Sequence, residues 1–214
     1  MTEQLPAEIM QKAAKGLSCI AHPLRLRILE FLDVNGRSSV SQIAGAVDAD
    51  QVIVSQSLKK MRDARLVRTK RKGIFVYYEI YEEYPASLFV CMRKLYGAMT
   101  DSFEYCLDGC KKILPRDYTT MAAGRIKLFA HYDKMRILEY LTLFGESSVG
   151  DIASGVGLEP MKVSQFLKKM KEDEFVACRR DGRFVFYGIL RGIPKTAVLC
   201  IRKRYDSLTD KTDF

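Results

Sequence analysis

Apolar residues recur at helical spacing near the start of the chain and change to another pattern further on. Between Leu24 and Leu32 they lie three or four residues apart, which is typical of one buried face of a helix. Pro23 suits the first turn of that helix, and Gly36 suits its end. We therefore predict a helix between these two residues.

Two more helices and a hairpin follow in the pattern. A short helix is predicted from Val40 to about Val47, and another from about Asp50 to Ala64 with Val54, Leu58 and Met61 on its buried face. Segments 66–70 and 74–80 are rich in Val, Phe and Tyr and are separated by Arg-Lys-Gly at 71–73, which predicts a β-hairpin with a glycine turn. From Pro85 to Leu114 we expect one helix of about 45 Å, at about 1.5 Å per residue, with Gly97 and Gly109 as candidate interruptions.

The whole pattern returns 109 residues later. Residues 21–96 align without a gap to 130–205, and 33 of these 76 pairs are identical. VSQSLKKM at 54–61, for example, lies over VSQFLKKM at 163–170. The chain is therefore predicted to be two copies of one module.

Composition narrows the function classes. The formal charge is +9 and the pI about 9.2, which points towards a polyanionic partner such as nucleic acid or an anionic membrane surface. A merely basic soluble protein is the alternative, and composition alone does not decide between the two. There is no stretch of about 18 apolar residues that would span a membrane, and no secretory signal is visible. Six cysteines are too few for a disulfide scaffold, so we expect a reduced, cytoplasmic setting.

Helix, short helix, turn, helix and basic hairpin is the order of a winged helix-turn-helix, a mainly α fold with small β-hairpin wings. The sequence resembles the ArsR/SmtB family of bacterial and archaeal repressors. The resemblance is carried by HPLRLRIL at 22–29, SVSQIA at 39–44, VSQSLKKMRDARLV at 54–67 and KGIFVYYEI at 72–80, and again by MRIL, SVGDIA, VSQFLKKM and DGRFVFYGI between 135 and 189.

The resemblance implies an arrangement for the two copies. Family members usually carry one module and form homodimers through their first and last helices, so this chain is expected to fold as an intrachain pseudo-dimer. We predict module one at 1–97, a connecting helix or linker at 98–118 and module two at 119–214. A homodimer with four modules is the alternative to a monomeric pseudo-dimer.

Residues of the third predicted helix that the core does not need are polar or basic. Short polar groups can hydrogen-bond base edges in the major groove, and lysines and arginines can neutralise phosphates. A solvated polar surface is the alternative, but the recurrence in both copies favours contact with double-stranded DNA. The predicted DNA-binding residues are Gln51, Ser55, Gln56, Lys59 and Arg62 with the wing residues Arg71 and Lys72 in copy one, and Lys162, Ser164, Gln165 and Lys168 with the wing residues Arg180 and Arg183 in copy two.

Metal sensing of the family kind is disfavoured. Metal-sensing relatives carry Cys-x-Cys at the short helix, where this chain has Ser39 and Ser41, then Ser148 and Gly150. A serine hydroxyl does not replace a thiolate on a soft metal. Cys106 and Cys110 remain candidates for a soft ion or a redox pair, but they belong to an apolar stripe and we favour packing for them.

We predict a sequence-specific DNA-binding transcriptional regulator, most simply a repressor, with no cofactor, no metal and no membrane partner. The alternatives are a winged-helix protein-interaction module and a cysteine-based redox or metal-responsive regulator. The sequence does not decide whether a small molecule acts as an effector. We expect no enzyme, since the sequence has neither a nucleophile-base pair nor a phosphate-binding glycine loop.

Overall fold

The computed structural model describes residues 3–81, 87–105, 111–190 and 193–209. They form two compact units: residues 15–127 make up one, and residues 1–14 together with 128–214 make up the other. Helix α1 (Ala7–Ile20) contributes its first residues to one unit and its last residues to the other. Within the described residues, no helix is both long and apolar enough to cross a membrane.

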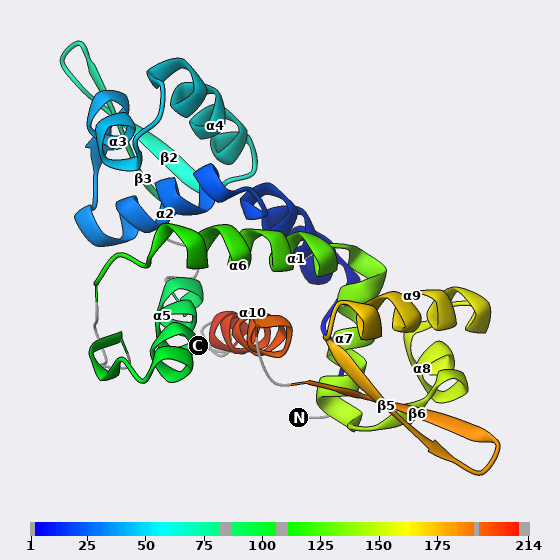
Figure 1. The fold of residues 1–214 in the computed structure, drawn as a ribbon. Coiled ribbons are helices and arrows are strands. Elements are labelled where there is room, and N and C mark those ends of the chain that lie inside the picture. The colour runs from blue at the N-terminus through cyan, green and yellow to red at the C-terminus, as the bar shows by residue number, and fades with distance from the viewer. Residues whose placement is uncertain (1–2, 82–86, 106–110, 191–192, 210–214) are drawn as a thin grey trace. The chain divides into compact units, whose positions relative to one another are not determined.

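Within the unit of residues 15–127, residues 23–80 form three helices and a three-stranded antiparallel sheet of order β1-β3-β2. Figure 1 shows the β2–β3 hairpin extending past α3. In chain order the elements are α2 (Pro23–Asn35), β1 (Ser38–Ser39), α3 (Val40–Val47), α4 (Gln51–Asp63), β2 (Val67–Lys72) and β3 (Phe75–Ile80).

The predicted core of this unit is largely confirmed. Val54, Leu58 and Met61 of α4 are fully buried, and Ile43 of α3 packs with them in the interior. In α2, however, Leu26 is buried while Leu24 is only partly covered. The spacing of apolar residues thus gave the right helix but one wrong core position.

A residue in the left-handed backbone conformation follows each of the helices α3 and α4. Asp48 (φ 51°) follows α3, and the amide of Ala49 donates to the carbonyl of Ala44 at 3.1 Å. Arg65 (φ 55°) follows α4, and the amide of Leu66 donates to the carbonyl of Met61 at 2.8 Å. In both cases the amide donates to the carbonyl five residues earlier. Such a bond satisfies a carbonyl that has no partner within the helix, and it turns the chain sharply into the next element.

The hairpin turn lies later than predicted. Lys72 pairs with Phe75, so Arg71 and Lys72 belong to β2 and the turn consists of Gly73 and Ile74. Gly73 has φ 61°, a conformation that costs glycine nothing and that two-residue hairpin turns require.

The single helix expected from Pro85 to Leu114 is wrong. Helix α5 (Ser87–Thr100) stops where Asp101 adopts φ 53° and the amide of Ser102 donates to the carbonyl of Gly97 at 3.0 Å. A short 3₁₀ turn follows at 103–105, and α6 (Arg116–Phe129) begins directly after Pro115. The same kind of left-handed cap that ends α4 therefore ends α5.

The other unit carries the same series of elements, with a second antiparallel sheet of order β4-β6-β5. Gly157, Glu174 and Gly182 have positive φ, as do the residues 109 positions earlier. The elements are α7 (Tyr132–Phe144), β4 (Ser147–Ser148), α8 (Val149–Val156), α9 (Pro160–Glu172), β5 (Val176–Asp181), β6 (Phe184–Ile189) and α10 (Ile193–Thr209).

A buried carboxylate holds the segment before α6 in the unit of 15–127. Glu30 of α2 is 1% exposed and accepts the backbone amide of Leu114 at 2.7 Å. Arg93 of α5 donates to Asp33 and to the carbonyl of Lys112, both at 2.9 Å. Burial raises the pKa of Glu30 to about 7, although the Leu114 amide and Arg93 act in the opposite direction.

The other unit holds the segment before α1 in the same way. Glu139 of α7 is 0% exposed and accepts the amide of Leu5 at 2.7 Å. Arg202 of α10 donates to Glu139 at 2.9 Å and to the carbonyl of Glu3 at 2.6 Å. Each unit thus fixes a Leu-Pro segment on a buried glutamate, and in both cases the segment and the glutamate are far apart in sequence.

Candidate nucleic-acid interface

Helices α3 and α4 form a helix-turn-helix whose turn is set by side-chain caps. Ser39 accepts the amide of Gln42 at 3.3 Å, and the Gln42 side chain accepts the amide of Ser39 at 2.9 Å. Asp50 accepts the amides of Val52 at 2.8 Å and Ile53 at 3.3 Å at the start of α4. These bonds satisfy amides that a helix start leaves open and fix the direction of α4.

The predicted contact residues of α4 share its solvent face. Their buried neighbours Val54 and Leu58 lie on the opposite side. Arg62 is the one that pairs with a described neighbour, Asp63, at 4.0 Å. Lys59 forms no ion pair with any residue that the structure describes, so its charge is available. The exposed predicted residues are Gln51, Ser55, Gln56, Lys59 and Arg62.

Helix α9 presents the corresponding surface in the other unit. Here Glu159 precedes the helix without a side-chain cap bond, and Pro160 occupies the first turn. Lys169 is held by Asp173 and Glu172, whose hydrogen bonds raise its pKa, whereas Lys168 forms no ion pair among the described residues. The exposed predicted residues are Lys162, Ser164, Gln165 and Lys168.

At the base of the first wing three cations pair with one carboxylate, whereas the cations at its tip form no ion pair with described residues. Burial alone would raise the pKa of Glu79, but hydrogen bonds from Arg37, Arg68 and Lys70 lower it to about 2. The nitrogen–oxygen distances of the three pairs are 2.9, 2.7 and 3.3 Å. The predicted wing residues Arg71 and Lys72 are exposed at the end of β2 and form no ion pair with described residues.

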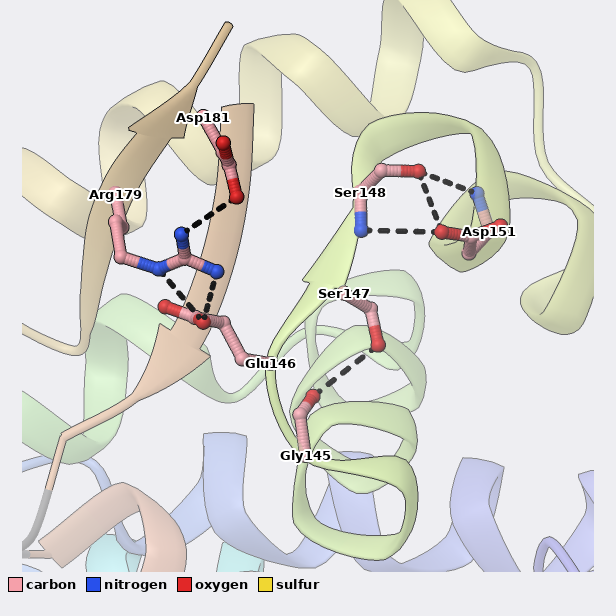
Figure 2. Close-up of polar contacts among 7 residues, drawn as sticks. All are labelled: Gly145, Glu146, Ser147, Ser148, Asp151, Arg179 and Asp181. Carbon is pink, nitrogen blue, oxygen red and sulfur yellow. Dashed lines mark hydrogen bonds and ion pairs between the residues drawn. The ribbon is translucent and has the colours of Figure 1, made fainter. Parts of the chain in front are cut away.

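At the base of the second wing, Arg179 pairs with carboxylates at other positions (Figure 2). Arg179 of β5 donates to Glu146, in the loop before β4, and to Asp181, in both cases at 3.1 Å. The predicted residues Arg180 and Arg183 are exposed, and the Arg183 guanidinium lies 5.0 Å from the centroid of the Phe184 ring. The tip of the second wing therefore also carries exposed cations, Arg180 and Arg183.

Sequence reasoning missed the carboxylates that hold the wing bases. A signal for them exists in the alignment of the two copies. Arg37 and Glu79 of copy one correspond to Glu146 and Gly188 of copy two, so the carboxylate moves from the strand to the loop. Such a paired change of charge at two aligned positions indicates spatial contact.

The thiols and imidazoles do not form a metal site among the described residues. No group of three or more His, Cys, Asp or Glu side chains gathers there. Cys106 and Cys110 lie outside the described residues. Burial raises the pKa of Cys19. His131 caps α7 by accepting the amide of Asp133 at 3.3 Å, whereas the His22 side chain makes no cap bond.

Similarity to known proteins places this geometry among DNA-binding regulators. Residues 22–69 match the family described as bacterial regulatory protein, arsR family. The chain is 35% identical over 92 residues to the nodulation protein NolR of Rhizobium meliloti, covering 43% of this chain and 75% of that protein. It is 29% identical over 99 residues to the biofilm growth-associated repressor of Agrobacterium fabrum, covering 44% and 84%. It is 31% identical over 91 residues to the transcriptional repressor SmtB homolog of Synechocystis, covering 40% and 68%.

Proposed function

Since the chain belongs to the arsR family of bacterial regulatory proteins and is a DNA-binding regulator, we propose that it is a repressor whose single chain supplies two winged helix-turn-helix modules. Module one comprises residues 1–97 and module two residues 119–214, with a connection at 98–118. The compact units differ from these bounds in two places, because residues 1–14 pack with residues 128–214 and residues 119–127 pack with the unit of 15–127. Each module inserts one helix into the major groove and lays one wing along the backbone. Three relatives carry the word repressor in their names, which supports the sign of regulation.

One observation carries this proposal: the same polar and basic positions are exposed on α4 and on α9. Ser55 and Gln56 correspond to Ser164 and Gln165, and Lys59 corresponds to Lys168. A merely solvated helix face has no need to keep a glutamine and a lysine at fixed positions in two copies that share fewer than half their residues.

The roles of these side chains follow from their chemistry. A glutamine amide matches the donor and acceptor pattern of adenine in the major groove, so Gln56 and Gln165 read bases. Lys59 and Lys168, which form no ion pair with the residues that the structure describes, contact phosphates and fix the orientation of each helix. The wing tips add phosphate contacts, while cations at the wing bases already pair with Glu79 and Glu146.

A salt titration with the intact chain tests this function. Affinity for duplex DNA, followed by fluorescence anisotropy, should fall steeply with salt because bound cations release counterions. A motif selected from a random duplex pool should bind more tightly than the unselected pool. Equal and weak binding to both would favour a protein-interaction module and overturn the proposal.

Matched substitutions separate the two roles. Gln56→Ala and Gln165→Ala should each cost about 1–3 kcal/mol on the selected motif and little on random DNA, because only base contacts are lost. Lys59→Ala and Lys168→Ala should weaken both alike and reduce the salt slope by about one each. A glutamine variant with unchanged preference would exclude that glutamine from base reading.

Subunit count tests the pseudo-dimer. Light scattering of the protein–DNA complex should give one chain on a bipartite site with unequal halves. Two chains on a strictly palindromic site, each protecting DNA with only one module, would contradict the use of both modules.

A further inference from the structure

The first turn of α9 carries a network that its counterpart in α4 lacks. The ammonium of Lys162 lies 2.7 Å from a carboxylate oxygen of Asp133 in the first turn of α7. The same ammonium is 5.8 Å from the centroid of the Phe166 ring. Phe166 in turn lies 5.6 Å from the ring of His131, which caps α7. Lys162 is therefore held from two sides.

The four corresponding positions of copy one cannot form this network. Asp133 corresponds to Leu24, Lys162 to Ile53 and Phe166 to Ser57, and only the histidine is retained. Ile53 is 52% exposed, so copy one presents a branched apolar side chain where copy two presents an ammonium. The carboxylate, the cation and the ring are thus all present in one copy and all absent from the other.

We propose that Lys162 is a specificity-determining residue and that Asp133 is its positioning residue. The two modules then read different base pairs at corresponding positions of the two half-sites. This inference rests on the DNA-binding function proposed above. Lys162 recognises guanine, and Ile53 contacts the methyl group of thymine. These are the partners that each side chain can take in the major groove.

The geometry suits base reading better than a simple phosphate contact. An ammonium has three donors, and Asp133 occupies one, which leaves two for the N7 and O6 acceptors of a guanine. The Lys162 side chain is 48% exposed and Asp133 only 14%, so the cation faces solvent while the carboxylate stays behind it. A free lysine loses rotamer freedom on binding; one that is already held loses less.

Stability is a minor part of this arrangement. Ion pairs with a partly exposed partner contribute little to folding. Lys162→Ile, Ile53→Lys and Asp133→Leu each install the residue that the other copy carries at that position. Changes in DNA preference can therefore be separated from changes in folding, and thermal unfolding of each variant provides that check.

The test is selection from a random duplex pool with the intact chain, comparing wild type, Lys162→Ile, Ile53→Lys and Asp133→Leu. Lys162→Ile should replace a guanine by a thymine at one place in one half-site and reduce discrimination there by about 5- to 150-fold. Ile53→Lys should make the opposite change in the other half-site. Lys12→Ala, which removes an exposed lysine of α1 outside the proposed interface, should leave both motifs unchanged.

The role of Asp133 is tested by the ratio of specific to random binding, which a purely structural role would leave unchanged. Asp133→Leu should lower the ratio of specific to random binding while raising affinity for random duplex, since a carboxylate is lost and Lys162 is no longer held. Asp133→Glu should restore the ratio. A ratio that stays at the wild-type value in Asp133→Leu would overturn the positioning role.

The outcomes separate this inference from the function on which it rests. If wild type selects a motif and Lys162→Ile selects the same one, Lys162 is a phosphate contact and the inference is wrong. If wild type selects no motif, the proposed function itself fails, and this inference fails with it.

Discussion

Replacing Glu30 with glutamine should remove a loss of stability that accompanies rising pH. The Glu30 side chain is buried, and one of its oxygens accepts the Leu114 amide at 2.7 Å. Burial raises its pKa from 4.5 to about 7 in the folded protein. Because the folded-state pKa is the higher one, the contribution of Glu30 to stability is complete below pH 4.5 and is lost as the pH rises through 7.

The size of the effect follows from the two pKa values. The interval from 4.5 to about 7 corresponds to roughly 3 kcal/mol, at about 1.4 kcal/mol for each tenfold change in proton affinity. Glutamine keeps an oxygen that can accept the Leu114 amide and carries no charge at any pH. The free energy of unfolding of Glu30→Gln, minus that of wild type, should therefore rise by roughly 3 kcal/mol between pH 4.5 and pH 8.

Urea unfolding followed by circular dichroism at several pH values measures this difference. Glu8→Gln makes the same chemical change on an exposed residue of α1 and controls for the loss of one negative charge. A difference for Glu30→Gln that stays constant from pH 4.5 to 8 would refute the reasoning, because ionisation of Glu30 would then carry no folding cost.

Two further pairs of substitutions test local geometry by urea unfolding. A Cβ on Gly155 would clash with the Tyr140 ring, so Gly155→Ala should destabilise the protein by about 1–3 kcal/mol. Gly45→Ala, where a Cβ would meet open space, should stabilise it by up to about 1 kcal/mol, and equal effects of the two substitutions would contradict the clash. Asp50→Ala should cost about 1 kcal/mol because two amides lose their cap, and Glu159→Ala, which removes no cap bond, should cost clearly less; similar losses would argue against the cap.

Local signals in the sequence were sufficient for the elements that position the interface. The spacing of Val54, Leu58 and Met61 predicted α4 and its buried face, and all three are 0% exposed. The helix expected at 85–114 failed because its end depends on a left-handed Asp101, which aspartate adopts far less regularly than glycine. Periodicity cannot show such a cap, since the apolar stripe continues past it.

The candidate interface was predictable in its exposure and not in its contacts. Exposure of Gln56 and Lys59 follows from the buried face of α4, because the remaining positions of an amphipathic helix must face solvent. The pairing of Lys162 with Asp133 joins two helices, and no local rule connects residues so far apart. Only the alignment of the two copies shows that both positions changed together.

The bond between the Leu5 amide and Glu139 also sets an order for folding. It joins residues separated by 134 positions, and the contact of Arg202 with Glu3 joins residues separated by 199. The unit of residues 15–127 is continuous in sequence and can close while the ribosome is still adding the second copy. The discontinuous unit is complete only after Arg202 has emerged, because its guanidinium donates to the carbonyl of Glu3 and to Glu139. During synthesis the nascent chain therefore passes through a stage in which the unit of residues 15–127 is complete and the other unit is not.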